Sequence, residues 1–281
     1  MTAFGIQGSS PLVDGPPEPG HYVRIAQAAE ATGFDSLWAS DHIAFHHPLL
    51  DVTVALATFA AVTERIRIGA GVLLLPLRPP ALVAREFASL DYVSGGRAIL
   101  GVGVGGEVRA DFEAVGVPIR ERGARTDESM RALRKLFPRQ TPAPVQSGGP
   151  PLWVGGRSDA AIRRAVRFGD GWFPLWVSPE RYAEGLAQVG PGRTAALVLP
   201  ALVGGTTEEA RLYLSRRYAT EFSAHAIERY CLVGSPSQCA ERVGEYVAAG
   251  AEHVVFHPAV EPSRLEEQVE LLAEVAYAAA R

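Results

Sequence analysis

The chain has 281 residues and a formal net charge of −4 at pH 7; 47% of its residues are hydrophobic and 21% are charged. These values are typical of a folded protein that can build a large core without disulfide bonds. The balanced charge argues against a nucleic-acid surface, and no apolar stretch approaches the roughly 20 residues of a membrane span.

Two features bear on the cell compartment. The two cysteines, Cys231 and Cys239, form no CxxC pair and are too few for a disulfide framework, which suits a reducing environment. The opening "MTAFGIQGSS" lacks the basic and apolar segments of a secretion signal. We therefore expect a cytoplasmic protein that binds neither nucleic acid nor membrane.

The first half of the chain alternates short apolar runs with helical patterns. A strand over residues 4–7 precedes a helix near residues 20–32. The second strand, "FDSLWAS", precedes a helix that Asp51 can cap. The third, "RIRIGAGVLLL", begins with alternation and ends as an apolar run, as expected for a strand that becomes buried on both faces.

The second half continues the same rhythm. Pro79 and Pro80 fit the first turn of a helix, "AILGVGVGG" is the fourth strand, and residues 107–137 hold two helical stretches. The Pro-rich "PRQTPAPVQSGGP" is expected to be a loop and not a domain linker, because "PLWVGG" resumes the pattern directly after it. Three more strands, each followed by a helix, complete the series: "GWFPLW", "TAALVLPALV" and "EHVVFHP".

These eight β/α units predict the α/β class and, within it, a closed parallel (β/α)8 barrel that forms a single domain over residues 1–281. The alternative is an open, doubly wound sheet. In a barrel, the residues that directly follow each strand meet in one pocket. Those positions are Gln7, Asp41, His42, residues 69–72, residues 103–107, residues 155–157, Trp172, Phe173, Trp176 and His257.

Three histidines, His42, His46 and His47, occur together in "ASDHIAFHHP". A metal site would need further ligands from other strand ends, where only Glu107 and His257 are present, and Pro48 disfavours a helix that would align the rings. We therefore expect no metal. His46 and His47 are interpreted as loop residues, whereas His42 lies at a strand end and can act as a proton donor or acceptor, the alternative being a structural histidine.

Two glycine-rich segments are candidates for binding a cofactor. Gly101, Gly103 and Gly106 match GxGxxG, but in the fourth unit, so we interpret Gly103, Gly105 and Gly106 as letting a ligand approach the backbone. Glu107, directly after them, can transfer a proton or simply begin the next helix. In "WVGGRSDAAIRR", the backbone of Gly155 and Gly156, the start of the helix and the Arg157 side chain suit a phosphate, although an ordinary strand-to-helix turn has the same pattern.

Several long segments resemble the luciferase-like superfamily of flavin- and deazaflavin-dependent oxidoreductases. They are "EATGFDSLWASDH", "TERIRIGAGVLLLPLRPPALVAREFASLDYVSGGRAILGVGVGG", "PLWVGGRSDAAIRRAVRFGDGWFP" and "VGSPSQCAERVGEYVAAGAEHVVFHP". The resemblance covers almost the whole chain and implies a TIM barrel that binds FMN or the deazaflavin coenzyme F420 at its carboxyl-terminal mouth.

The resemblance also implies roles for individual residues. "SDH" places Asp41 and His42 beside the reactive face of the cofactor ring, with His42 stabilising an oxygen and Asp41 helping to orient the cofactor. "GAGV" matches a bulge with a non-proline cis peptide, which here would join Gly71 and Val72. Glu107 matches a proton-transferring glutamate, although it stands one place later than in the family pattern. "VGGR" resembles the phosphate site.

Four hypotheses about function follow. The first is an F420-dependent oxidoreductase that transfers a hydride to or from a small organic substrate. The second is an FMN-dependent monooxygenase that uses O2 and receives reduced flavin from a separate reductase. The third is a protein that binds the cofactor without catalysis, and a metal-dependent barrel hydrolase ranks after it. The loop after the long helix is shorter than in relatives, which would affect the pocket or a dimer surface; relatives commonly form homodimers.

Overall fold

The computed structural model describes residues 1–9, 13 and 15–280. In this part of the chain, eight parallel strands close into a barrel, because β6 pairs with β7 and β9 pairs with β1. The expected (β/α)8 architecture is therefore confirmed, and the open sheet is wrong. The barrel strands are β1 (Ala3–Ser9), β2 (Ser36–Ala39), β3 (Arg67–Leu74), β4 (Ala98–Gly103), β5 (Leu152–Gly155), β6 (Gly171–Phe173), β7 (Thr194–Val203) and β9 (His253–Pro258).

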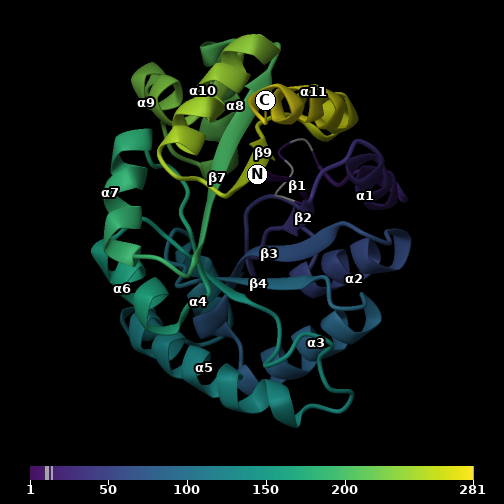
Figure 1. Ribbon diagram of the computed structural model, residues 1–281, viewed down its shortest axis with the longest axis vertical. Helices are drawn as coiled ribbons and strands as arrows, with labels where there is room; N and C mark the ends of the chain where they lie inside the picture. Colours follow the sequence, from purple (N-terminus) through teal and green to yellow (C-terminus); the bar gives the residue numbers. More distant parts are fainter. Residues whose placement is uncertain (10–12, 14, 281) are drawn as a thin grey trace.

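The helices surround the strands (Figure 1). Asp51 caps α2 as expected, since its carboxylate accepts from the backbone N–H groups of Thr53 and Val54. No helix within the described ranges has the length and apolar character needed to cross a bilayer. The helices are α1 (His21–Ala31), α2 (Val52–Val62), α3 (Pro80–Val93), α4 (Arg109–Ala114), α5 (Arg122–Leu136), α6 (Asp159–Phe168), α7 (Pro179–Val189), α8 (Thr207–Tyr218), α9 (Ala224–Tyr230), α10 (Pro236–Ala248) and α11 (Leu265–Ala279).

One strand was not expected from the sequence. β8 (Leu232–Gly234) lies outside the barrel and pairs with the distal end of β7, where Ala201 is opposite Leu232. Three residues are too few to show an alternating pattern, so the sequence gives no strand signal there. The connection after β7 is consequently longer than a single helix, because it contains α8, α9 and β8 before α10.

The Pro-rich segment between α5 and β5 is a loop, as expected. Asp91 of α3 anchors it: its carboxylate accepts from the backbone N–H of Gln146 at 2.8 Å and from the Gln146 side chain at 2.7 Å. The same side-chain amide donates to the carbonyl of Ala98 on β4 at 2.7 Å. The loop is therefore fixed to the outside of the barrel.

Aromatic rings fill the barrel interior. The rings of Trp38 and Phe173 are 4.7 Å apart and those of Trp38 and Trp153 are 5.3 Å apart. Beneath them, the Ser36 hydroxyl accepts from the Trp38 indole N–H at 2.7 Å and lies 2.6 Å from His253 Nε2. Burial, together with the charge of Arg67, lowers the pKa of His253 to about 3, so this ring is neutral inside the barrel.

Glycines on neighbouring strands make room for these rings. A Cβ atom at Gly69 would lie 2.4 Å from the Trp38 ring, and one at Gly171 would lie 2.8 Å from Trp153. A Cβ at Gly5 would lie 2.1 Å from the Ser36 hydroxyl. The barrel therefore depends on matching large side chains on one strand with glycine on the next.

We expect Gly69→Ala to destabilise the protein by about 1–3 kcal/mol, because the added methyl group would overlap the buried Trp38 ring. The matched control is Gly244→Ala in α10, where a Cβ would meet nothing within 4 Å and alanine favours the helix. Urea unfolding of the two variants and the wild type measures both effects. Equal stability of Gly69→Ala and wild type would contradict this packing account.

Candidate active site

A cavity of about 300 Å³ opens at the carboxyl ends of the barrel strands. The residues that sequence analysis assigned to catalysis or cofactor binding line it: Asp41, His42, Gly71, Val72, Gly103, Gly105, Gly106, Glu107, Gly155, Gly156 and Arg157. Among the other strand-end positions expected in the pocket, Gln7 and Trp172 do not line it. Residues from seven of the strand ends or the loops after them thus meet in one place, as the barrel topology requires. The cavity is the candidate site for a cofactor and its substrate.

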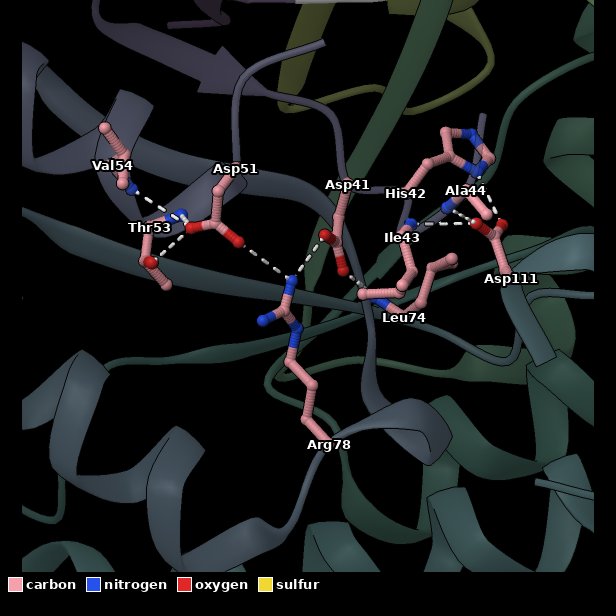
Figure 2. A network of polar contacts seen from close by, with 10 residues as sticks. All are labelled: Asp41, His42, Ile43, Ala44, Asp51, Thr53, Val54, Leu74, Arg78 and Asp111. Carbon is pink, nitrogen blue, oxygen red and sulfur yellow. Dashed lines mark hydrogen bonds and ion pairs between the residues drawn. The ribbon is translucent and has the colours of Figure 1, made fainter. Parts of the chain in front are cut away.

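The loop after β2 is held by one buried carboxylate, that of Asp111 on α4. One oxygen lies 2.8 Å from His42 Nδ1, and the other accepts from the backbone N–H groups of Ile43 at 2.8 Å and Ala44 at 2.7 Å (Figure 2). Because a carboxylate only accepts, Nδ1 of His42 must carry the proton. With the Nδ1 position engaged by Asp111, Nε2 is the ring nitrogen available to a ligand.

The Asp41 side chain has a different environment from that of its neighbour His42. It is fully buried, and its carboxylate accepts from the backbone N–H of Leu74 at 2.9 Å and from Arg78 at 2.7 Å. Arg78 also lies 3.3 Å from the carboxylate of Asp51, the cap of α2 (Figure 2). Asp41 therefore ties the end of β2 to the end of β3, and both of its carboxylate oxygens accept from donors within the protein.

The expected bulge lies at the end of β3. Ala70 is opposite Leu100 and Leu73 is opposite Val102, so β3 has one extra residue there, and the Gly71–Val72 peptide is cis. The Gln7 side chain supports the bulge by donating to the Gly71 carbonyl at 3.1 Å and to the Ser40 hydroxyl at 2.7 Å.

The Val72 side chain extends over the neighbouring strands. A Cβ at Gly103 would lie 2.5 Å from Val72, and one at Gly155 would lie 2.9 Å from it. Gly101 is restricted by the bulge itself, since its Cβ would lie 2.1 Å from the Ala70 carbonyl. Close packing between protein segments therefore requires glycine at positions 101, 103 and 155. Gly105 and Gly106 have a different reason: their φ values of 63° and 115° are positive, and glycine adopts such a backbone turn most easily.

The segment after β5 forms a turn into α6. Gly156 has φ of 101°, Ser158 caps the helix by accepting from the Ala161 N–H, and Arg157 is exposed at the cavity rim. The Trp172 indole fixes the turn by donating to the Gly156 carbonyl at 2.9 Å. Backbone N–H groups at a helix start, next to a guanidinium, are a donor set that fits a phosphate.

Trp172 itself was expected at the pocket, and this was wrong. It is buried behind the barrel, where its ring stacks on Tyr182 of α7 at 5.4 Å. Its neighbour Phe173, which was also expected at the pocket, faces the interior and lines the cavity. The difference follows from strand geometry, since adjacent residues point to opposite faces.

His257, at the end of β9, lines the same cavity and is 4% exposed. Burial, together with the charge of Arg217, lowers its pKa well below the usual range, so the ring is neutral at neutral pH. The two strand-end histidines therefore differ: His42 faces a carboxylate, whereas His257 faces a cation.

Glu107 is exposed at the rim, between β4 and the first residue of α4. The other two histidines of the β2 loop lie away from the cavity lining: His46 is exposed, and His47 Nε2 is 3.1 Å from the Arg216 carbonyl. Within the described ranges, no three His, Cys, Asp or Glu side chains come together as metal ligands.

Comparison with known proteins places this chain in a family. A model described as luciferase-like monooxygenase matches residues 2–211. The chain belongs to the luciferase-like monooxygenase family. The family resemblance seen in the sequence is therefore confirmed.

Proteins similar to this luciferase-like chain include two relatives by sequence and one solved structure. An uncharacterised protein of Mycobacterium tuberculosis is 35% identical over 60% of this chain and 69% of its own length. The F420-dependent glucose-6-phosphate dehydrogenase of Rhodococcus erythropolis is 29% identical over 85% of this chain and 88% of that enzyme. The solved structure of monooxygenase RslO1 from Streptomyces bottropensis has a TM-score of 0.83 at 21% identity, covering 98% of this chain and 99% of that one, which shows a shared fold.

Sequence reasoning missed several residues that line the cavity of this luciferase-like protein, among them Phe45, Asp111, Arg217 and Tyr218. Arg217 and Tyr218 lie on α8, in the connection after β7, where the sequence predicted only a single helix. Asp111 is 69 positions from His42, and no local pattern relates two residues so far apart. In the structure, Asp111 and Phe112 are the buried residues of the short helix α4. An aspartate next to a large apolar residue in this helix is the signal that could have indicated a buried carboxylate.

We expect Asp111→Asn to reverse the tautomer of His42, because an amide nitrogen in place of the second oxygen would donate to Nδ1 and leave the ring proton on Nε2. Two-bond 1H–15N NMR correlations of the histidine rings measure the tautomer directly. The matched control is Glu113→Gln, an exposed carboxylate on the same helix, which should change nothing. An unchanged His42 tautomer in Asp111→Asn would contradict the assigned hydrogen bond.

Proposed function

We propose that the protein is an F420-dependent oxidoreductase that transfers a hydride to or from a small organic substrate. The observation that carries the proposal is the similarity to F420-dependent glucose-6-phosphate dehydrogenase over 85% of the chain, combined with a cavity that contains His42 at its strand end. The substrate of that relative is not assumed for this chain.

The residues present fit a flat ring that bears a phosphate. Val72, Phe173 and Val198 give the cavity an apolar wall, which suits the face of a ring system. The turn from Gly155 to Arg157 supplies backbone and guanidinium donors for the phosphate. In this arrangement the Gly71–Val72 bulge of β3 contacts one face of the ring, so β3 sets the position of the ring over the barrel.

Coenzyme F420, when bound, supplies the hydride chemistry. The residues of the chain handle the proton. In the oxidation of an alcohol, Nε2 of His42 would take the hydroxyl proton, while the hydride chemistry would belong to the coenzyme. Asp111 stabilises the resulting imidazolium, because its carboxylate already accepts from Nδ1. In the reverse direction, protonated His42 returns the proton to the carbonyl oxygen.

Other residues of the cavity control access to it. Phe45, Trp176 and Tyr218 contribute aromatic walls that limit water around the reacting carbons. The Trp176 ring is itself held by Phe222, with the ring centres 5.0 Å apart. Glu107, exposed at the rim, is placed to exchange protons between the cavity and solvent.

The second candidate is an FMN-dependent monooxygenase, favoured by the likeness of the fold to monooxygenase RslO1. That reaction would need reduced flavin from a reductase. Both candidates use the same cavity and differ in which ring system binds tightly.

A titration of the purified protein with F420 and with FMN, each followed by fluorescence, tests the proposal. We expect F420 to bind more tightly, and His42→Ala to keep that binding while lowering turnover with a panel of alcohols about 10²- to 10⁴-fold, the usual range for loss of a general acid–base group. His46→Ala, in the same loop, is the matched control and should behave as wild type. Tighter binding of FMN would reject the F420 assignment, and full turnover in His42→Ala would reject the catalytic role.

A further inference from the structure

Gln7, on β1, is buried next to the cavity without lining it. Its side chain is 1% exposed, yet it contacts two residues that do line the cavity, Ser40 and Gly71. Ser40 directly follows β2 and precedes Asp41 and His42. Any effect of Gln7 on a ligand therefore passes through one of these two neighbours.

The contacts of the Gln7 amide determine which atom is the donor. A carbonyl oxygen only accepts, so the amide nitrogen, and not the amide oxygen, must face the Gly71 carbonyl at 3.1 Å. The same nitrogen lies 2.7 Å from the Ser40 hydroxyl oxygen. Ser40 therefore accepts from Gln7, and the hydroxyl hydrogen of Ser40 must point elsewhere.

The cavity is where that hydrogen can find an acceptor. Within the described ranges, the Ser40 hydroxyl makes no second hydrogen bond, and Ser40 lines the cavity two residues before His42. A hydroxyl that accepts from an amide is also a stronger donor, because hydrogen bonds in a chain polarise one another. The cavity wall thus presents a buried hydroxyl donor on the same strand end as the His42 ring.

The Gln7 amide oxygen indicates that this arrangement is more than good packing. It is buried without a hydrogen-bond partner, and it lies against the Gly71 backbone, since a Cβ at Gly71 would be 3.2 Å from it. A buried acceptor without a partner destabilises the folded state, and an apolar side chain of similar size would avoid that cost. The donor role of the amide nitrogen gives a reason for glutamine at this position.

We propose that Ser40 donates a hydrogen bond to an oxygen atom of the bound ligand, and that Gln7 is the positioning residue that directs the hydroxyl into the cavity. The acceptor is a carbonyl oxygen of the cofactor ring, which F420 and FMN both carry, or the oxygen on the reacting carbon of the substrate. The inference rests on the proposed function, because it assumes ring and substrate in this cavity, and it applies to either ring system.

Ser40→Ala and Ser40→Thr test the donor, because threonine keeps the hydroxyl and alanine removes it. Titration with F420 and with FMN, without substrate, tests the ring as acceptor: Ser40→Ala should raise Kd roughly three- to tenfold, the usual effect of one hydrogen bond. With the substrate as acceptor, Kd for the ring is unchanged and kcat with the alcohol panel falls about 10²-fold. Ser40→Thr should keep the wild-type values in both assays.

Ser9→Ala is the matched control. It removes another buried hydroxyl, at the end of β1 and outside the cavity lining, and should change neither Kd nor kcat.

Gln7→Glu tests the positioning role. A carboxylate only accepts, so the Ser40 hydrogen would turn toward residue 7 and away from the cavity. We expect Gln7→Glu to reproduce the loss seen in Ser40→Ala, and the double variant to lose no more than either single variant. Losses that multiply in the double variant would reject the positioning role. The two Ser40 variants decide the donor role even if Gln7→Glu does not fold.

The proposed function and the Ser40 role fail in different ways. If the wild type binds neither ring, both are overturned. If the wild type binds a ring, an unchanged Kd and no loss of turnover in Ser40→Ala overturn the Ser40 role alone. A loss in Ser40→Ala that Ser40→Thr shares also overturns it, because the effect would then come from packing and not from the hydroxyl.

Discussion

The carboxylate of Asp111 is the interaction on which the rest of the site depends. It makes three contacts with one loop, to the His42 ring and to the backbone N–H groups of Ile43 and Ala44. A buried carboxylate with several donors holds its partners firmly, since releasing any one of them would leave a charge poorly solvated. The position of the loop, the tautomer of His42 and the direction of its free nitrogen therefore follow from one side chain on α4.

A second constraint is the fit between large side chains and glycine. Inside the barrel, Gly69 and Gly171 leave room for Trp38 and Trp153; at the mouth, Gly103 and Gly155 leave room for Val72. The same device thus builds the core and the floor of the cavity. The glycine-rich strand ends resemble a ligand-binding pattern. Two of these glycines, Gly103 and Gly155, instead allow one protein segment to approach another.

Much of this could be predicted from the sequence. The eight barrel strands are apolar enough to be recognised individually, and the rule that strand ends converge brought His42, Val72, Glu107 and Arg157 to one pocket, where the structure also places them. The sequence could not show Asp111 beside His42, because that contact depends on how α4 is folded back against the β2 loop. The sequence could not show β8, because a strand of three residues has no recognisable pattern. It also could not show which of Trp172 and Phe173 faces inward, because that depends on where the short strand β6 begins.

The central claim is that His42, oriented by Asp111, faces the ring of a bound deazaflavin at the mouth of the barrel. A crystal structure of the protein with F420 tests it most directly. The account predicts the ring against Val72, the phosphate at the turn of Gly155 to Arg157, and His42 with Nε2 toward the ring while Nδ1 keeps its hydrogen bond to Asp111. A ring bound outside this cavity, or a His42 side chain turned away from it with the Asp111 contact broken, would contradict the account.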